Sequence, residues 1–594
     1  MGNVTVERDV PVPMRDGTVL RADVYRPQSG GEFPALVLRT PYDKTSAQQV
    51  AYQHPVYYAR HGYLVVVQDV RGRYASAGTF VPYQNEAADG ADTIAWAARL
   101  DRCTGRVGTY GFSYAGAAQL LAAAEQPAAL ACAAPAFTSS DFYRDWTYVG
   151  GVLNHAFVVS WVLQMLAIPD LLRTGGHDAA ARVLAAQERL PHLYRSRPLA
   201  ELAVLRDTGA AGYFFDWLEH DTYDDYWRAV SIRERHARIG VPCLHIGGWY
   251  DTFVEGTLDN FTGLTTSDGP DEVRHRLIVG PWAHSPWGRR VGGRDFGAAA
   301  GGVVDRAQLA WFDHWLKDRP LDGSPVRVFV MGADRWYDAP TWPMDNAAVQ
   351  EWYLHAEHGA QSVSGDGRLD RRPPAQEPPD AYVAMPARPV PSAGGRSSSD
   401  PAVVPMGPAD QSAVEGRHDV LVYTTAQLAQ DMEVIGTVWL VLYAATDGLD
   451  CDWMAKLVDV DEGGGTVNLC DGAVRAQLHD SLSQPRSLRP GEVYEYRVRV
   501  GSTAYRFRRG HRLRLLVSSS NFPQYAVNPQ TGERASHAGP FSLRMATQTV
   551  FHDATRPSRL ELPVTAGVRR STVVDPPGGS PMTAAHPHDG RPPP

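Results

Sequence analysis

Short apolar runs recur along the first half of the chain, and few of them show the polar alternation of a half-exposed sheet. Strands that are buried on both faces have this pattern, and they occur in parallel sheets covered by helices. Helix-forming stretches at 86–99 and 117–126 separate the runs, so strands and helices alternate. The pattern predicts an α/β fold with strands at 35–38, 63–68, 107–111, 131–134, 241–247 and 276–280.

The pattern changes twice further along, and 594 residues are too many for one core. Between residues 140 and 235, apolar residues recur near helical spacing, which predicts a helical cap that excludes water from a site beneath it. From residue 348, after long Pro- and Gly-rich loops at 357–396, β-rich segments alternate with turns, as in a sandwich or jelly roll. The expected domains are α/β at 1–139 and 236–347, a cap at 140–235, a β domain at 348–572 and a flexible tail at 573–594.

The motif Gly111-Phe-Ser-Tyr-Ala-Gly116 lies between a predicted strand and a predicted helix. A serine at a sharp strand-to-helix turn has its hydroxyl exposed above the sheet, which is the nucleophile elbow of α/β-hydrolases. Ala115 stands where the pattern G-x-S-x-G has its second glycine, and Gly116 follows one residue later. The motif is short enough to occur by chance, so Ser113 needs partners before it can be taken as a nucleophile.

Those partners follow in the order this fold requires, which is serine, acid, histidine. The predicted strand at 241–247 runs into Gly248-Trp-Tyr-Asp251, and the strand at 276–280 runs into Pro281-Trp-Ala-His284. His284 would remove the proton of the serine as general base, and Asp251 would orient the imidazole. Glu255 and Asp259 are competing acids, but we expect both on the next helix.

A serine hydrolase also needs two donors for the oxyanion that forms during acyl transfer. The backbone N–H of Tyr114, the residue after the serine, is expected to be one of them. The loop Thr40-Pro-Tyr-Asp-Lys44 has no Gly-Gly pair to offer a second amide, which makes the hydroxyl of Tyr42 a candidate. From the residues alone, simple packing of Tyr42 at a strand end is an equal alternative.

Together with segments in the second half of the chain, these motifs resemble the cocaine esterase family of α/β-hydrolases. This family also holds Xaa-Pro dipeptidyl peptidases, α-amino acid ester hydrolases and glutaryl-cephalosporin acylases. The resemblance extends over about residues 6–555 and implies a Ser113, Asp251 and His284 triad, an oxyanion hole of Tyr42 and Tyr114, and a C-terminal jelly roll. The matching segments are Thr40-Pro-Tyr-Asp-Lys44, Gln68-Asp-Val-Arg-Gly-Arg73, Gly111-Phe-Ser-Tyr-Ala-Gly116, Trp249-Tyr-Asp251, Gly280-Pro-Trp-Ala-His-Ser285, Phe329-Val-Met-Gly332, Ala455-Lys-Leu-Val-Asp-Val460 and Ser518-Ser-Ser-Asn-Phe-Pro523.

Within the family the chain most resembles the cocaine esterases, whose benzoyl pocket is lined by aromatic side chains. The matching positions are Trp146, Trp161 and Phe253, together with Gln53. Ordinary core packing is the alternative for these residues. The resemblance implies a serine hydrolase that cleaves esters, and amides as a further option, with an apolar or aromatic acyl group through an acyl-enzyme.

Other functions can use the same triad. An acyltransferase, or an amide-cleaving acylase or peptidase, would form the same acyl-enzyme, and the sequence does not separate them from an esterase. Aminopeptidases and amino-ester hydrolases need carboxylates to bind an ammonium group. The obvious acid cluster here is Asp221, Asp224 and Asp225, for which solvation or helix capping is the simpler interpretation. A non-catalytic binding protein is argued against by the complete triad.

Composition excludes several classes of function. The net charge of −9 and the lack of a long Lys/Arg run argue against nucleic-acid binding, and no phosphate-loop or dinucleotide motif is present. Five scattered cysteines have neither disulfide-framework nor metal-site spacing, so no cofactor and no metal are expected. Without a signal-like N-terminus or an uninterrupted apolar span, we expect a cytoplasmic enzyme that binds no membrane. The oligomeric state stays open, a homodimer included.

Overall fold

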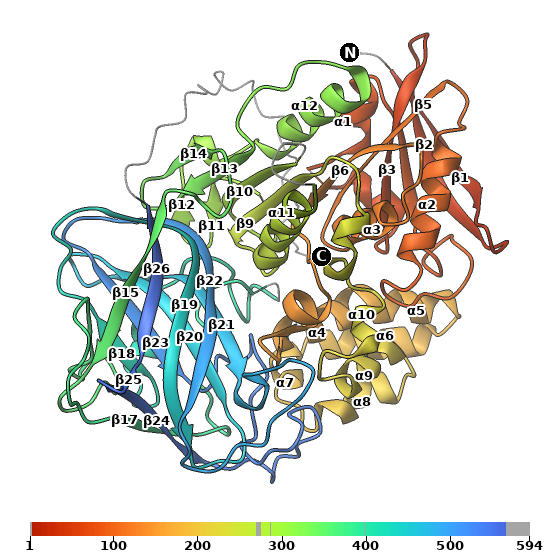
Figure 1. The fold of residues 1–594 in the computed structure, drawn as a ribbon. Coiled ribbons are helices and arrows are strands. Elements are labelled where there is room, and N and C mark those ends of the chain that lie inside the picture. The colour runs from red at the N-terminus through yellow and green to blue at the C-terminus, as the bar shows by residue number, and fades with distance from the viewer. Residues whose placement is uncertain (1–2, 51, 269–274, 286, 398–399, 566–594) are drawn as a thin grey trace, which may run out of the picture.

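The computed structural model describes residues 3–50, 52–268, 275–285, 287–397 and 400–565, so the tail expected at 573–594 lies outside the described residues. A ten-stranded sheet forms the upper part of Figure 1, in the spatial order β1-β2-β4-β3-β5-β6-β9-β10-β13-β14. Its strands are β1 (Val4–Pro13), β2 (Val19–Pro27), β3 (Phe33–Thr40), β4 (Leu64–Asp69), β5 (Cys103–Phe112), β6 (Leu130–Ala136), β9 (Leu244–Tyr250), β10 (Arg276–Ala283), β13 (Val326–Val330) and β14 (Arg335–Ala339).

The centre of this sheet is parallel from β4 to β13, whereas β1, β2 and β14 pair antiparallel at its edges. The predicted α/β class is therefore confirmed, and each of the six predicted strands corresponds to one strand of the parallel centre. The strand predicted at 241–247 begins three residues later, at Leu244. Strand β1 has no apolar run because it is an edge strand whose side chains are mostly exposed.

Helices cover both faces of the parallel strands. Alternate side chains of β3 divide between the two faces: Ala35 and Val37 pack with the core under α2 (Glu86–Ala97) and α3 (Tyr114–Ala123). Leu36 and Leu38 pack on the other side, with α1 (Pro55–Arg60) and α12 (Val304–Lys317). Burial on both faces is why the sequence shows continuous apolar runs rather than alternation.

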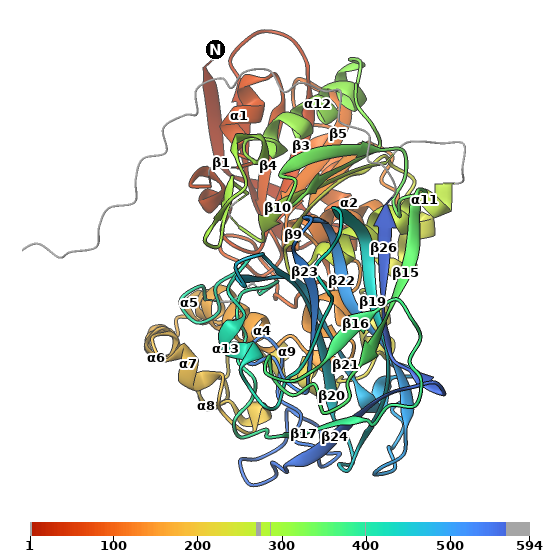
Figure 2. The same cartoon turned by 90° about the vertical axis from the view of Figure 1, so that its left-hand side faces the viewer.

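The segment between β6 and β9 is mainly helical and lies below the sheet in Figures 1 and 2. It is not helical throughout: a π-helical turn at Tyr143–Thr147 is followed by a hairpin of Tyr148–Val149 (β7) and Val152–Leu153 (β8), so the helical prediction for 140–235 was wrong at that hairpin. The helical run His155–Arg173 has the length and apolarity of a membrane span, but 67% of its apolar window is buried inside the protein, as in a core helix. The helices are α4 (His155–Trp161), α5 (Ile168–Arg173), α6 (His177–Gln187), α7 (Leu190–Leu193), α8 (Ala203–Arg206), α9 (Gly212–Glu219) and α10 (Asp225–Arg228).

The second half of the chain forms a separate assembly of strands that begins with β15 (Ala347–His355). Strands β19 (Met432–Thr446), β20 (Asp452–Val460), β22 (Tyr494–Phe507) and β23 (Arg512–Ser518) lie in the β-rich part expected from residue 348. The loops predicted at 357–396 contain two short paired strands, β16 (Arg368–Asp370) and β17 (Asp380–Ala384), so that part of the prediction was incomplete. The remaining strands are β18 (Leu421–Thr424), β21 (Thr466–Arg475), β24 (Ala546–Asp553), β25 (Arg556–Pro557) and β26 (Arg559–Thr565).

Candidate active site

Ser113 stands at the sharp turn between β5 and α3. Its backbone has φ 60° and ψ −127°, a conformation that is strained for a residue with a side chain and is typical of functional turns. The turn closes so tightly that a Cβ on Gly111, where φ is +136°, would lie 2.7 Å from the Cβ of Ala115. A Cβ on Gly116 would lie 2.8 Å from the Cβ of Thr138 and 2.9 Å from the carbonyl oxygen of Ala136. The glycine after Ala115 therefore allows α3 to pack closely against the end of β6.

The carboxyl ends of β5, β9 and β10 bring Ser113, Asp251 and His284 together. The Nε2 atom of His284 lies 3.1 Å from the Oγ of Ser113, and its Nδ1 atom lies 2.8 Å from the Oδ1 of Asp251. Because a carboxylate only accepts, Nδ1 carries the proton of the neutral ring and Nε2 is free to accept the serine proton. Asp251 is fully buried, while the His284 side chain keeps 13% of its surface exposed.

The competing acids lie on α11 (Val254–Asp268) and are held by arginines. Glu255 receives a hydrogen bond of 2.7 Å from Arg396 and pairs with Arg499 at 2.5 Å. Burial alone would raise the pKa of Glu255, but the two arginines lower it to about 2. Asp259 pairs with Arg499 at 3.3 Å. These ion pairs leave Asp251 as the carboxylate that contacts His284.

Tyr114 is the first residue of α3, and its side chain points away from Ser113 into the core. Its hydroxyl donates to the Oε1 of Glu86 at 2.9 Å and accepts from the backbone N–H of Tyr83 at 2.9 Å. The side chain is fully buried. The group of Tyr114 that can face the serine is therefore the backbone amide at the helix N-terminus, where N–H groups favour negative charge.

Tyr42 reaches Ser113 from the loop after β3. Its backbone N–H donates to the Thr40 hydroxyl at 3.1 Å, and its carbonyl accepts from the Ser46 hydroxyl at 2.8 Å. Burial raises the pKa of the Tyr42 phenol, although hydrogen bonds with Trp161 and Ser113 act in the opposite direction. The phenol therefore stays protonated at neutral pH and can donate a hydrogen bond.

Three of the four residues predicted to line the pocket form one aromatic cluster beside His284. Phe253 is perpendicular to the imidazole with ring centroids 5.1 Å apart, and Trp146 stacks on Phe253 at 4.2 Å. Trp161 meets Trp146 edge to face at 5.2 Å. Trp146 and Phe253 are fully buried and Trp161 is 6% exposed, so the cluster is continuous with the core.

Gln53 lies apart from this cluster. Its backbone N–H and its side-chain amide bind Asp305 and Gln308 of α12, at 2.8 Å and 3.2 Å. Sequence reasoning missed Phe112 and Trp287, which are in contact with each other at 5.0 Å. Phe112 lies 6.0 Å from the His284 ring, and the Trp287 indole donates to the His284 carbonyl at 2.8 Å. The sequence offered one signal for each residue, because Phe112 directly precedes Ser113 and Trp287 lies three residues after His284.

The acids considered for an ammonium site have other partners. Asp224 caps α10 by accepting from the N–H of Tyr226 and pairs with His220 at 2.5 Å. Asp225 pairs with Arg228 at 2.9 Å. Asp221 lies 3.6 Å from Arg534 in the β-stranded assembly. The capping interpretation is thus confirmed for Asp224.

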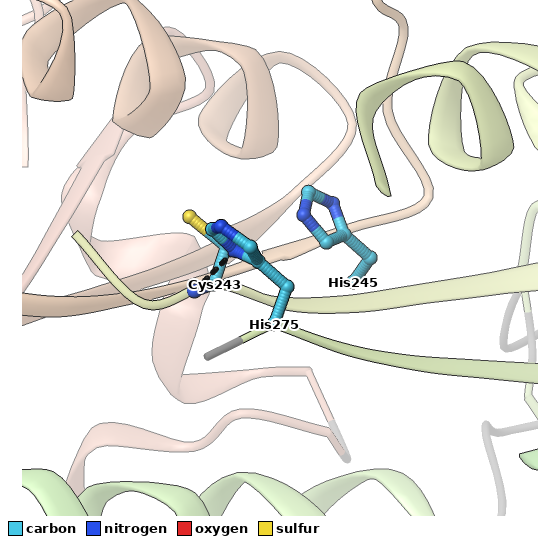
Figure 3. Close-up of side chains that lie close together, drawn as sticks. All are labelled: Cys243, His245 and His275. Atoms are coloured by element: carbon cyan, nitrogen blue, oxygen red, sulfur yellow. Dashed lines mark hydrogen bonds between the residues drawn. The ribbon is translucent and has the colours of Figure 1, made fainter. Parts of the chain in front are cut away.

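Among the described residues, Cys243, His245 and His275 form one group whose donor atoms lie within 4.8 Å of one another (Figure 3). The group lies at the amino ends of β9 and β10, at the opposite edge of the sheet from Asp251 and His284. The backbone N–H of Cys243 donates to the Nδ1 of His275 at 3.2 Å. The neutral ring then carries its own proton on Nε2, so neither nitrogen offers a free lone pair, and we assign no metal to this group.

Two family models match consecutive parts of this chain. Residues 16–286 match the X-Pro dipeptidyl-peptidase (S15 family) model, and residues 321–561 match the model of the X-Pro dipeptidyl-peptidase C-terminal non-catalytic domain. The first range contains Ser113, Asp251 and His284. The second lies almost entirely in the β-stranded half.

Individual relatives match over nearly their whole length. Cocaine esterase of Rhodococcus sp. (strain MB1 Bresler) is 36% identical over 95% of this chain and 99% of its own. A putative serine esterase of Mycobacterium bovis is 25% identical over 93% of this chain and 94% of its own. Two solved structures superpose on this chain with a TM-score of 0.81 each, over 95% of this chain and 97% of theirs. One is an aminopeptidase from a marine sediment Thaumarchaeota archaeon, at 26% identity, and the other is an α-amino acid ester hydrolase, at 25% identity.

Proposed function

We propose that this chain, which belongs to the X-Pro dipeptidyl-peptidase (S15) family of α/β-hydrolases, is a serine hydrolase of carboxylic esters that works through an acyl-enzyme. The observation that carries this proposal is the unbroken chain of hydrogen bonds from Ser113 through His284 to Asp251. Cocaine esterase, at 36% identity over 95% of the chain, supports ester hydrolysis rather than acyl transfer.

In the proposed mechanism, the Oγ of Ser113 attacks the ester carbonyl while Nε2 of His284 takes its proton. Asp251 accepts from Nδ1, holds the ring in the reactive tautomer and stabilises the imidazolium. The new oxyanion is bound by the amide of Tyr114 and the hydroxyl of Tyr42. His284 then protonates the leaving alcohol, and a water molecule activated by the same nitrogen releases the acid from Ser113.

An apolar or aromatic acyl group is the substrate feature we propose. The aromatic cluster of Trp146, Trp161 and Phe253 adjoins His284 and supports this choice, because such side chains bury apolar groups at little conformational cost. Gln53 stays a prediction as a pocket residue, with its amide directed to α12. The solved α-amino acid ester hydrolase and aminopeptidase make α-aminoacyl esters the competing substrate class to test.

We further propose that the helical segment at 140–235 is a cap, that residues 1–139 and 236–347 form the catalytic domain, and that 348–572 form a jelly roll. The position of α4 beside Tyr42 supports the role of the cap. Contacts such as the 2.7 Å bond from Arg396 to Glu255 support a role of the β domain in holding α11 in place. Five cysteines without a disulfide agree with a cytoplasmic enzyme.

The test is pre-steady-state hydrolysis of p-nitrophenyl acetate, butyrate, benzoate and an α-aminoacyl ester. We expect a burst that favours butyrate or benzoate. Ser113→Ala or His284→Ala should each lower turnover by about 10⁶-fold if the triad acts as a unit. Ser267→Ala, a serine on the surface of α11, is the matched control and should keep full activity. Losses below about tenfold in both catalytic variants would overturn the assignment.

A further inference from the structure

We infer that Trp161 is a positioning residue for the oxyanion hole, whose indole N–H orients the hydroxyl of Tyr42. This inference rests on the proposed function and adds to it: Trp161 would act on catalysis through Tyr42 and not only as a wall of the acyl pocket. The carrying observation is a hydrogen bond of 2.9 Å between the Nε1 of Trp161 and the phenol oxygen of Tyr42.

The direction of this bond follows from the chemistry of the two groups. An indole N–H can only donate, so the phenol oxygen of Tyr42 must be the acceptor. The single hydrogen of the phenol therefore cannot point at Trp161 and is left for another acceptor. Ser113 lies close enough to the same hydroxyl to lower the pKa of the phenol. The indole thus directs the proton of Tyr42 toward the place where the oxyanion develops.

Trp161 is well held for such a role. Its ring is parallel to Trp217 at 5.7 Å and to Phe157 at 5.7 Å, with interplanar angles of 5° and 10°. Trp146 closes the third side edge to face. Fixed on these sides at the end of α4, the indole cannot swing away from Tyr42 without disturbing the aromatic packing, so the donor is preorganised before substrate binds.

The same bond should make Tyr42 a better donor. A hydroxyl whose oxygen accepts a hydrogen bond is polarised, and its own O–H bond to an anion becomes stronger. This gain is largest when the full oxyanion is present, which is in the transition state and not in the bound ester. Loss of the indole N–H should therefore lower kcat and leave KM nearly unchanged.

The first experiment compares Trp161→Phe with Trp217→Phe in hydrolysis of p-nitrophenyl butyrate. Trp161→Phe keeps an aromatic ring and removes the N–H, and we expect kcat to fall about tenfold with KM within about threefold. Trp217→Phe makes the same substitution in the ring stacked on Trp161 without touching Tyr42. It should leave kcat within about twofold of wild type, because a phenyl ring can still stack on Trp161 and the bond from Trp161 to Tyr42 remains.

The second experiment asks whether the effect passes through Tyr42. Tyr42→Phe should lower kcat by about 10²–10³-fold as an oxyanion donor is lost. In that background, Trp161→Phe should cause no further loss, since its N–H has no phenol to orient. An equal loss with and without Tyr42, an unchanged kcat in Trp161→Phe, or a change confined to KM would each overturn the inference.

A third measurement avoids the variant at 161 in case it folds poorly. In protein labelled with 5-fluorotryptophan, one ¹⁹F resonance should shift in Tyr42→Phe, and the same resonance should shift when phenylboronic acid forms its tetrahedral adduct with Ser113. If the resonance that shifts in Tyr42→Phe does not shift when the adduct forms, the inference is overturned. Ser113→Ala separates a failure of the proposed function from a failure of this inference. If Ser113→Ala keeps its burst, the proposed function is wrong, independently of the results for Trp161.

Discussion

Replacement of Arg73 tests how the helical segment is attached to the loop that carries Tyr42. The guanidinium is buried and donates through Nε to the carbonyl of Pro41 at 2.9 Å. Its other nitrogens donate to the carbonyls of Met165 at 2.8 Å and Leu166 at 3.0 Å, and to the carboxylate of Asp170 at 2.6 Å. One side chain therefore joins the residue before Tyr42 to the helix that follows Trp161.

The sequence explains why these carbonyls need a donor. Pro169 has no N–H, so the carbonyl of Met165, four residues earlier, has no partner in a regular helix. The chain also passes through a π-helical turn at Val162–Ala167, which disturbs the usual ladder. Arg73 supplies the missing donors from outside the helix.

The expected magnitude follows from what Arg73→Met leaves behind. A half-buried carboxylate at Asp170 would lose its cation, and breaking such a pair costs about 3–5 kcal/mol. Arg73→Lys keeps the charge but lacks the planar fork that reaches several acceptors, so we expect a loss of about 2–3 kcal/mol. Arg372→Lys, in an exposed pair with Asp370, is the matched control and should not change stability measurably.

The assay is urea unfolding followed by tryptophan fluorescence, since Trp161, Trp217 and Trp227 lie in the helical segment. Activity should fall together with stability, because the loop before Tyr42 loses its anchor. Wild-type stability in Arg73→Lys would refute the claim that the planar guanidinium stabilises the protein by donating to several acceptors at once. Wild-type stability in Arg73→Met would refute the larger claim that Arg73 holds the helical segment to the loop.

Two further predictions concern stability. Gly116→Val should destabilise the protein by more than the roughly 1–3 kcal/mol typical of overpacking, because its Cβ would lie under 3 Å from Thr138 and from the carbonyl of Ala136. Gly212→Ala should be tolerated, because no atom lies within 4 Å of the added Cβ. Equal thermal midpoints for the two variants would contradict this prediction. Burial lowers the pKa of His155 to about 4, below the roughly 6.5 of an unfolded histidine. Stability that is present above pH 6.5 is therefore lost as the pH falls toward 4, by up to about 3 kcal/mol in total. His155→Phe gives up the bond to the Tyr194 carbonyl but takes up no proton, so its deficit against wild type in urea unfolding should shrink from pH 7 to pH 4.5, and a constant deficit would count against a buried neutral imidazole.

Much of the fold was predictable because its signals are local. Buried parallel strands are read from short apolar runs, and the strand–serine–helix order around Ser113 follows from small residues at a turn. The irregular start of the helical segment was not predictable in this way. Val149 and Leu153 fit helical spacing, but the hairpin they form depends on contacts with distant strands: the carbonyl of Gly150 accepts from the N–H of Arg475 in the β-stranded half.

The sequence by itself determined which residue types stand at the carboxyl ends of β5, β9 and β10, because chain order and strand patterning are local properties. Only the tertiary structure decided which acid contacts His284. Glu255 and Asp259 form ion pairs with arginines from the other half of the chain instead. It also decided that Trp161 donates to Tyr42, residues 119 apart in sequence. A hydrogen bond depends on angstrom-scale placement of two side chains, and that placement is set by the packing of whole elements, which no local pattern encodes.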